Sequence, residues 1–244
     1  MTRCRAIFCY CFACLFLPLA GHAQAGSWPT PSISSGDTPL APTVSVRELN
    51  IPDKAKRAYQ KGVGRIAARD WAGSIPDFEK AIKAYGDLYE AYYRIGFARL
   101  QLHQVDAAGN AFRKAIELSE GTYAPAFFGL GVVFSAAGEY QEAAEVVQSG
   151  LNMAPMDAGG HCTLAWILYS LQRINEAEYS AQQAVRWNPN FAMARLMLAE
   201  IHRTQNKLPD LIEDLTIYLR LDPNGPKSVL ARQLLDKAQP AVRN

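Results

Sequence analysis

The chain has 244 residues, of which 49% are apolar, enough for one sizeable core or for an extended array of small units. Its formal charge of +2 comes from Arg3 and Arg5, because the other 23 basic residues (25 minus these two) balance 23 acidic ones. No cluster of Lys and Arg is present that could displace counterions from phosphates, so the sequence argues against nucleic acid as a partner.

Residues 1–25 have the pattern of a cleavable secretory signal. The two arginines are followed by an apolar run over residues 6–17, and the small residues Ala23 and Ala25 offer two cleavage points. The alternative is a transmembrane anchor, but spanning a bilayer takes about 20 apolar residues, and this run is shorter and is followed by Pro18. We therefore expect an exported protein, either periplasmic or secreted.

Residues 26–50 are rich in Pro, Ser, Thr and Gly and are predicted to form a linker. Four of the five cysteines lie inside the predicted signal, so only Cys162 would remain in the mature chain, and no intramolecular disulfide is expected. At the end of the linker, the segment 44–51 carries several apolar residues and could pack in extended form on whatever follows.

From Pro52 onward the apolar residues recur every three to four positions, the helical period, and short polar turns interrupt them. The pattern also repeats over a longer distance. Pro155, Pro189 and Pro223 are each 34 residues apart, and Leu130, Leu164 and Leu198 keep the same step. A period of this length indicates stacked helical hairpins.

This pattern resembles the tetratricopeptide repeat family, which asks for small residues where paired helices approach and bulky ones between them. Five units are predicted within residues 51–225, with one extra residue between the second and third; they start near Ala55, Tyr89, Ala124, Ala158 and Ala192. The resemblance implies an all-α fold: an α-solenoid of about five antiparallel helix pairs, wound into a right-handed superhelix with a concave groove.

Three positions of the unit carry the alignment. The small position 8 is Gly62, Gly96, Gly131, Ala165 or Ala199. The bulky position 24 is Phe78, Phe112 or Val147 in the first three units. The apolar residue that opens each second helix is Trp71, Val105, Tyr140, Ile174 or Leu208.

The two terminal units depart from the pattern. The fifth has Leu211 and Tyr218 at positions that are small elsewhere, and a further helix within residues 226–244 is predicted to cap it. The first has Lys61 and Arg65 at positions 7 and 11 and a proline inside its second helix.

No catalytic, cofactor or metal site is predicted, and no small-molecule substrate. The histidines lack the spacing of metal ligands. His161 and Cys162 are neighbours on a helix, so their side chains point about 100° apart, which is poor geometry for a nucleophile and its base. We expect Cys162 to be a buried packing residue.

The predicted binding surface is the groove, because positions 5, 9 and 12 of the first helices share the face opposite the hairpin interior. That face is rich in aromatic residues, and we predict that it binds a partner protein or peptide through Tyr59, Tyr93, Phe97, Phe128, Trp166 and Tyr169. Family members that clamp the C-terminal carboxylate of chaperones resemble each other in having Lys and Asn at groove positions, and this chain has no Asn at position 9. An extended apolar or aromatic peptide, or an amphipathic helix, is the expected ligand.

Two alternatives stay open for this surface and for the protein as a whole. The segment 44–51 could itself cover the groove. The leading functional hypothesis is an exported interaction scaffold, and the rival is an accessory subunit of a cell-envelope assembly with peripheral membrane association. An enzyme is the third hypothesis.

Overall fold

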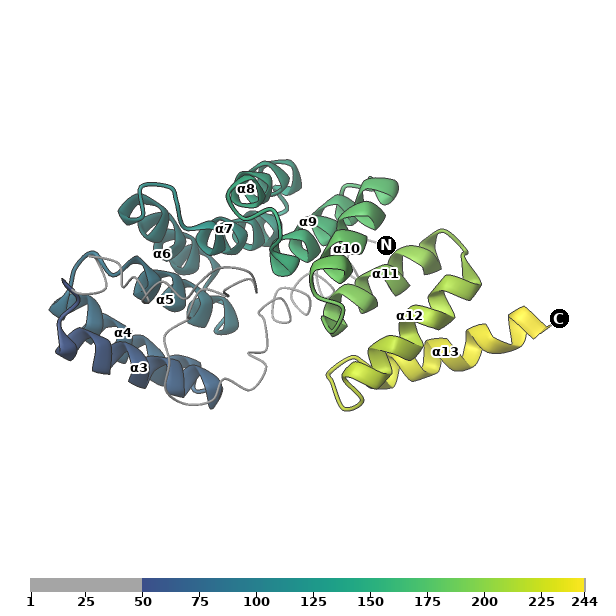
Figure 1. The fold of residues 1–244 in the computed structure, drawn as a ribbon, viewed down its shortest axis with the longest axis horizontal. Coiled ribbons are helices and arrows are strands. Elements are labelled where there is room, and N and C mark those ends of the chain that lie inside the picture. The colour runs from purple at the N-terminus through teal and green to yellow at the C-terminus, as the bar shows by residue number, and fades with distance from the viewer. Residues whose placement is uncertain (1–49, 244) are drawn as a thin grey trace, which may run out of the picture.

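The computed structural model describes residues 50–243, and all regular structure within this range is helical. The predicted signal (1–25) and all but the last residue of the predicted linker (26–50) lie outside the described residues. Antiparallel helix pairs follow one another along an open arc, with α3 and α4 at one end and α12 and α13 at the other (Figure 1). The predicted α-solenoid is confirmed.

Five pairs and one further helix make up the described chain. The first helices of the pairs are α3 (Asp53–Ala67), α5 (Tyr89–Gln101), α7 (Ala124–Ala137), α9 (Ala158–Ser170) and α11 (Ala192–Thr204). The second helices are α4 (Trp71–Ala84), α6 (Val105–Leu118), α8 (Tyr140–Met153), α10 (Ile174–Trp187) and α12 (Leu208–Leu221). The last helix is α13 (Ser228–Arg243). Every second helix begins at its predicted residue, and the first helices do so in units two to five; α3 begins two residues before Ala55.

Position 8 must be small because the side chain at position 24 fills the space beside it. A Cβ atom added to Gly62 would lie 2.7 Å from a ring carbon of Phe78, and one added to Gly96 would lie 2.7 Å from a ring carbon of Phe112. Both rings are fully buried. Contacts this close cannot be accommodated in a densely packed interior, so glycine sets how closely the two helices of a hairpin approach.

The turn within each pair contains one residue in the left-handed region, with φ between 58° and 85°: Arg69, His103, Gly138, Gln172 or Asn206. The extra residue between units two and three lies in the loop 119–123. That loop contains two consecutive left-handed residues, Glu120 and Gly121, so the insertion is absorbed in a connection and leaves the helices in register.

First helices form the inner layer of the arc and second helices the outer one. α7 contacts α5 and α9, and α9 contacts α11, in addition to the contacts within pairs. At the C-terminal end α13 packs on α12, where Leu211 and Tyr218 are buried together with Ala231 and Ala238. The small residues that the fifth unit lacks are thus supplied by the capping helix.

Both terminal units carry a buried aspartate at position 23, paired with a basic residue at position 11. In unit one, Arg65 Nε donates to Asp77 Oδ2 at 2.8 Å, and Lys61 Nζ lies 3.5 Å from Oδ1 of the same carboxylate. In unit five, Asp214 Oδ2 lies 2.9 Å from His202 Nδ1. These pairs explain why Lys61 and Arg65 occupy apolar positions of the repeat: they compensate an acid that the hairpin buries.

Candidate functional site: the concave groove

A groove of about 700 Å³ runs along the inner layer from α5 to the loop after α12. Its walls combine aromatic and aliphatic side chains of the first helices with residues of the connections between units and a few residues of the second helices. Met156 and Trp187 lie on its border and are 65% and 38% exposed. An apolar surface of this kind, open to solvent, is typical of an interaction site.

Three of the predicted site residues meet in this groove. Tyr93, Phe97 and Phe128 all line it, from the neighbouring helices α5 and α7. Tyr93 and Phe128 are half-buried, whereas Phe97 is only 5% exposed. The ring of Phe97 meets that of Trp71 edge-on, with centroids 5.4 Å apart.

The other three predicted residues do not line this groove. Trp166 is 5% exposed, and its ring meets that of Tyr140 edge-on at 6.2 Å. Tyr169 is half-buried; its hydroxyl donates to Glu200 at 3.1 Å and hydrogen-bonds the Thr204 hydroxyl at 2.8 Å. Tyr59 is half-buried in the core of unit one, edge-on to a buried phenylalanine ring.

Phe97 and Trp166 share one structural relation. Each occupies position 9 and packs against the residue that opens the second helix of the preceding unit, Trp71 or Tyr140. Position 9 therefore faces the junction between units as well as the concave side. This burial differs from the expectation that the aromatic row is a surface that the hairpin interior does not need, because the interior of a solenoid also includes the contacts between hairpins.

Arg94, which is not among the predicted site residues, lies beside the groove. Arg94 Nε donates to the hydroxyl of Tyr59 at 3.4 Å, and its guanidinium carbon lies 5.6 Å from the ring centroid of Tyr93. The ring of Tyr123, from the loop between units two and three, meets Tyr93 edge-on at 5.5 Å. We call Arg94, Tyr59, Tyr93 and Tyr123 the Arg94 cluster. In the sequence, the cluster is indicated only by Arg94 at position 6, next to the groove residue Tyr93.

Burial raises the pKa of Tyr93 and the pKa of Tyr123 above the ordinary tyrosine value. Both phenols are neutral at physiological pH, as a tyrosine of ordinary pKa also is, and keep their O–H donors. The Arg94 cluster thus combines a guanidinium group with neutral hydroxyl donors.

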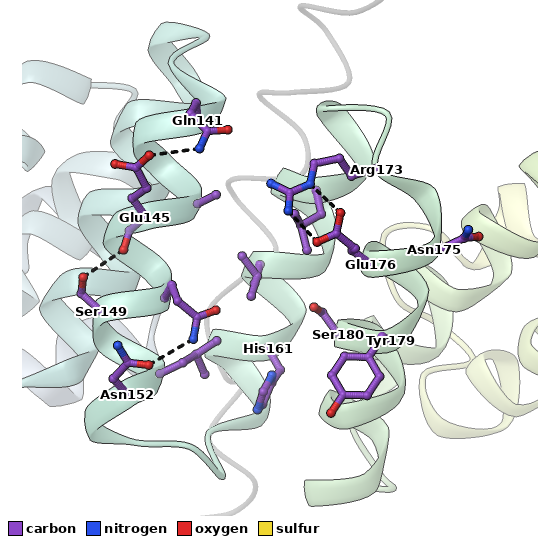
Figure 2. Close-up of a pocket in the computed structure, with 15 residues that line it drawn as sticks. Gln141, Glu145, Ser149, Asn152, His161, Arg173, Asn175, Glu176, Tyr179 and Ser180 are labelled. Carbon is purple, nitrogen blue, oxygen red and sulfur yellow. Dashed lines mark hydrogen bonds and ion pairs between the residues drawn. The ribbon is translucent and has the colours of Figure 1, made fainter.

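A second depression, also of about 700 Å³, lies on the outer side between α8 and α10, with α9 as its floor (Figure 2). Leu151, Leu164 and Leu168 contribute its apolar part. The rim is polar: Arg173 donates two hydrogen bonds to the carboxylate of Glu176, at 2.7 and 2.5 Å. Sequence patterns did not indicate this depression, because it arises where two second helices diverge.

The described residues hold no group of three or more His, Cys, Asp or Glu side chains arranged to bind a metal. Cys162 is fully buried, and burial raises the pKa of its thiol. The His161 ring instead hydrogen-bonds the backbone oxygen of Pro155, with Nε2 at 2.9 Å. Between residues 50 and 243, no helix has the length and apolar character needed to span a membrane.

Comparisons with known proteins agree with this architecture. A solved tetratricopeptide protein of Thermus thermophilus is 19% identical; the match covers 76% of this chain and 98% of that one, with a TM-score of 0.66. PilF of Pseudomonas aeruginosa is 15% identical over 76% of this chain and 84% of its own, with a TM-score of 0.65. YrrB, described as a tetratricopeptide protein with an unusual peptide-binding site, is 16% identical over 73% and 92%, with a TM-score of 0.51.

Among curated proteins, the human protein O-mannosyl-transferase TMTC3 is 24% identical over 189 residues, which is 76% of this chain. This chain spans only 18% of the length of that relative.

Two separate regions, residues 89–122 and 162–226, match the tetratricopeptide repeat family itself. The first region is unit two with the loop that follows it. The second begins inside α9 and runs through unit five. These two matches, with five helix pairs in register along one arc, identify tetratricopeptide repeats in this chain.

Proposed function

We propose that this protein is an exported interaction scaffold that binds an extended segment of a partner protein in its concave groove. The observation that carries the proposal is the groove itself, whose aromatic and aliphatic lining continues across several units and includes the exposed side chains of Met156 and Trp187. The tetratricopeptide repeat fold typically serves as a non-catalytic scaffold, and the relative YrrB is described with a peptide-binding site.

The shape of the lining favours an extended ligand. Groove residues come from α5, α7, α9 and α11, from the connections between units, and from parts of α6, α10 and α12. A chain segment that crosses these helices can place successive side chains against successive units, as peptides do in grooves read by regularly spaced pockets. A compact ligand would contact only part of this lining.

Export rests on the predicted signal in residues 1–25. N-terminal sequencing of the protein isolated from its host should show a chain that begins at Gln24 or Gly26, after Ala23 or Ala25. An intact Met1 in the membrane fraction would contradict cleavage. It would instead favour the accessory subunit of a cell-envelope assembly that is held at the membrane.

Site-specific photocrosslinking in the native host tests the groove. A benzoylphenylalanine in place of Met156 probes the groove, and one in place of Tyr179 probes the outer depression of Figure 2. The two positions are a matched pair, because their side chains are 65% and 63% exposed and neither is part of a core.

We expect position 156 to give a discrete adduct with another polypeptide, and position 179 to give none of the same mass. Identification of the adduct by mass spectrometry names the partner and its crosslinked segment. Adducts from position 179 alone would move the binding surface to the outer depression. Absence of adducts from both positions would contradict a stable protein partner.

A further inference from the structure

The charge of Arg94, next to the groove residue Tyr93, is left unexplained by the proposed function. Its side chain is half-buried, yet among the described residues no carboxylate oxygen lies within 4.0 Å of its guanidinium nitrogens. Arg65, Arg195 and Arg203 also lie on first helices and each pairs with a carboxylate, whereas Arg99 donates to the backbone oxygen of Ala107. A partly desolvated cation without an acidic partner is costly, and a ligand that brings the missing charge recovers that cost.

The surroundings of Arg94 orient its guanidinium group. The ring of Tyr93 lies beneath it at a distance favourable for a cation–π contact, and the hydroxyl of Tyr59 accepts from Nε. The remaining N–H donors belong to the two terminal nitrogens, which form the planar fork that matches a carboxylate. A group held in this way loses little conformational freedom when it binds an anion.

We propose that Arg94 binds the carboxylate of an acidic side chain within the extended partner segment that occupies the groove. This inference rests on the proposed function and adds a chemical requirement to the ligand: an Asp or Glu close to the apolar residues that contact Tyr93 and Phe128.

An internal side chain fits better than a chain terminus because of where Arg94 lies. It is in unit two: Tyr59 of unit one accepts from its Nε, and the Tyr93 ring beneath it meets the ring of Tyr123, from the loop that leads to unit three. The groove continues as far as the loop after α12, so a segment that passes Arg94 has surface on which to continue. A free C-terminus would leave one side of the cluster uncontacted.

The test is selection from a displayed library of random 12-residue peptides, followed by affinity measurement on the full chain. In one library format the peptide is followed by a fixed sequence, so that its only carboxylates are side chains. In the other format the peptide ends in a free carboxylate. Each format is selected against the wild-type chain and against the Arg94→Ala variant.

We expect wild-type selections in the first format to enrich apolar and aromatic residues together with one Asp or Glu at a constant spacing. Selections against Arg94→Ala should keep the apolar residues and lose the acid. In a selected peptide, Glu→Gln should weaken binding to the wild type by about tenfold or more, as loss of a charge-assisted hydrogen bond does, and by less than about twofold in Arg94→Ala.

Two variants control for charge and for folding. Arg113→Ala removes the same charge from the outer helix α6, where the side chain is exposed, and should not change the selected sequences. Arg94→Lys keeps the charge but loses the fork, and should give an intermediate affinity. Circular dichroism and melting of each variant establish that the fold is retained.

The outcomes separate this inference from the proposed function. Peptides enriched without an acid, or with the same acid in Arg94→Ala, would overturn the role of Arg94 while leaving a peptide-binding groove. Acid dependence seen only in the free-carboxylate format would overturn the choice of an internal side chain. No enrichment in either format would contradict the groove as a peptide site, and with it both proposals.

Discussion

The same substitution, glycine to alanine, should have opposite effects at two positions of the first helices. Gly64 in α3 and Gly96 in α5 are both helical, but an added Cβ at Gly64 would have nothing within 4 Å. At Gly96 it would lie 2.7 Å from a ring carbon of Phe112. The ring cannot shift away, because a Cβ at Gly129 on α7 would lie 2.5 Å from the same ring. Phe112 is thus held between two glycines.

The magnitudes follow from two competing effects. Alanine is favoured over glycine in a helix by about 0.5–1 kcal/mol, so Gly64→Ala should stabilise the protein by about that amount. At Gly96 the same gain is opposed by overpacking, which costs about 1–3 kcal/mol in a dense interior. Gly96→Ala should therefore destabilise the protein by about 1 kcal/mol, and by at most about 2.5 kcal/mol. Replacing the ring by a smaller side chain relieves the overpacking, so Gly96→Ala should cost less free energy in the Phe112→Leu background than in the wild type.

Thermal unfolding followed by circular dichroism measures both variants. For a chain of this size, 1 kcal/mol shifts Tm by about 2–4 °C, so the two variants should move in opposite directions by measurable amounts. Unfolding of repeat arrays can proceed in stages, and the sign of the shift is the decisive readout. If Gly96→Ala raised Tm as much as Gly64→Ala does, the pairing of positions 8 and 24 would be refuted.

Two further predictions concern burial and charge. Phe97→Ala should lower the free energy of unfolding by about 3 kcal/mol, because the ring packs against another unit, whereas Met156→Ala should change it by less than about 0.5 kcal/mol; equal melting of the two would place Phe97 on the surface. Asp77 and Asp214 should differ in pH dependence. For Asp77, burial raises the carboxyl pKa, but the Arg65 hydrogen bond and the nearby cations outweigh it, so its pKa is lowered from 3.8; burial leaves the pKa of Asp214 raised. The free energy of unfolding of the wild type, relative to that of Asp77→Asn, should therefore decrease as the pH falls below about 3.8. Relative to that of Asp214→Asn, it should increase as the pH falls toward 3.8, because the native state takes up a proton on Asp214 before the unfolded state does. Parallel pH profiles for the two variants, measured by denaturant unfolding, would contradict these assignments.

The repeat architecture could be predicted from the sequence because its determinants are local and recur five times. Apolar residues follow the helical period throughout the array. In addition, the residue that opens each second helix and the small residue at position 8 recur every 34 or 35 residues. Each pattern is weak evidence in a single unit, but its recurrence in five units makes the prediction strong. The predicted helix starts therefore agree closely with the structure. The capping helix was predictable for a related reason, since a solenoid end with bulky residues needs a cover.

Tertiary structure alone decided which aromatic residues are buried and which charges are paired. Phe97 and Tyr93 both lie on the groove-facing side of α5, yet Phe97 is almost fully buried because the preceding unit places Trp71 against it. Arg65 and Arg94 are both arginines on first helices, but only Arg65 has a carboxylate partner among the described residues, supplied by the second helix of its own hairpin. The physical reason is that periodicity determines which side of a helix a residue faces, whereas burial and pairing depend on the rotation between hairpins, which packing determines across residues far apart in the sequence.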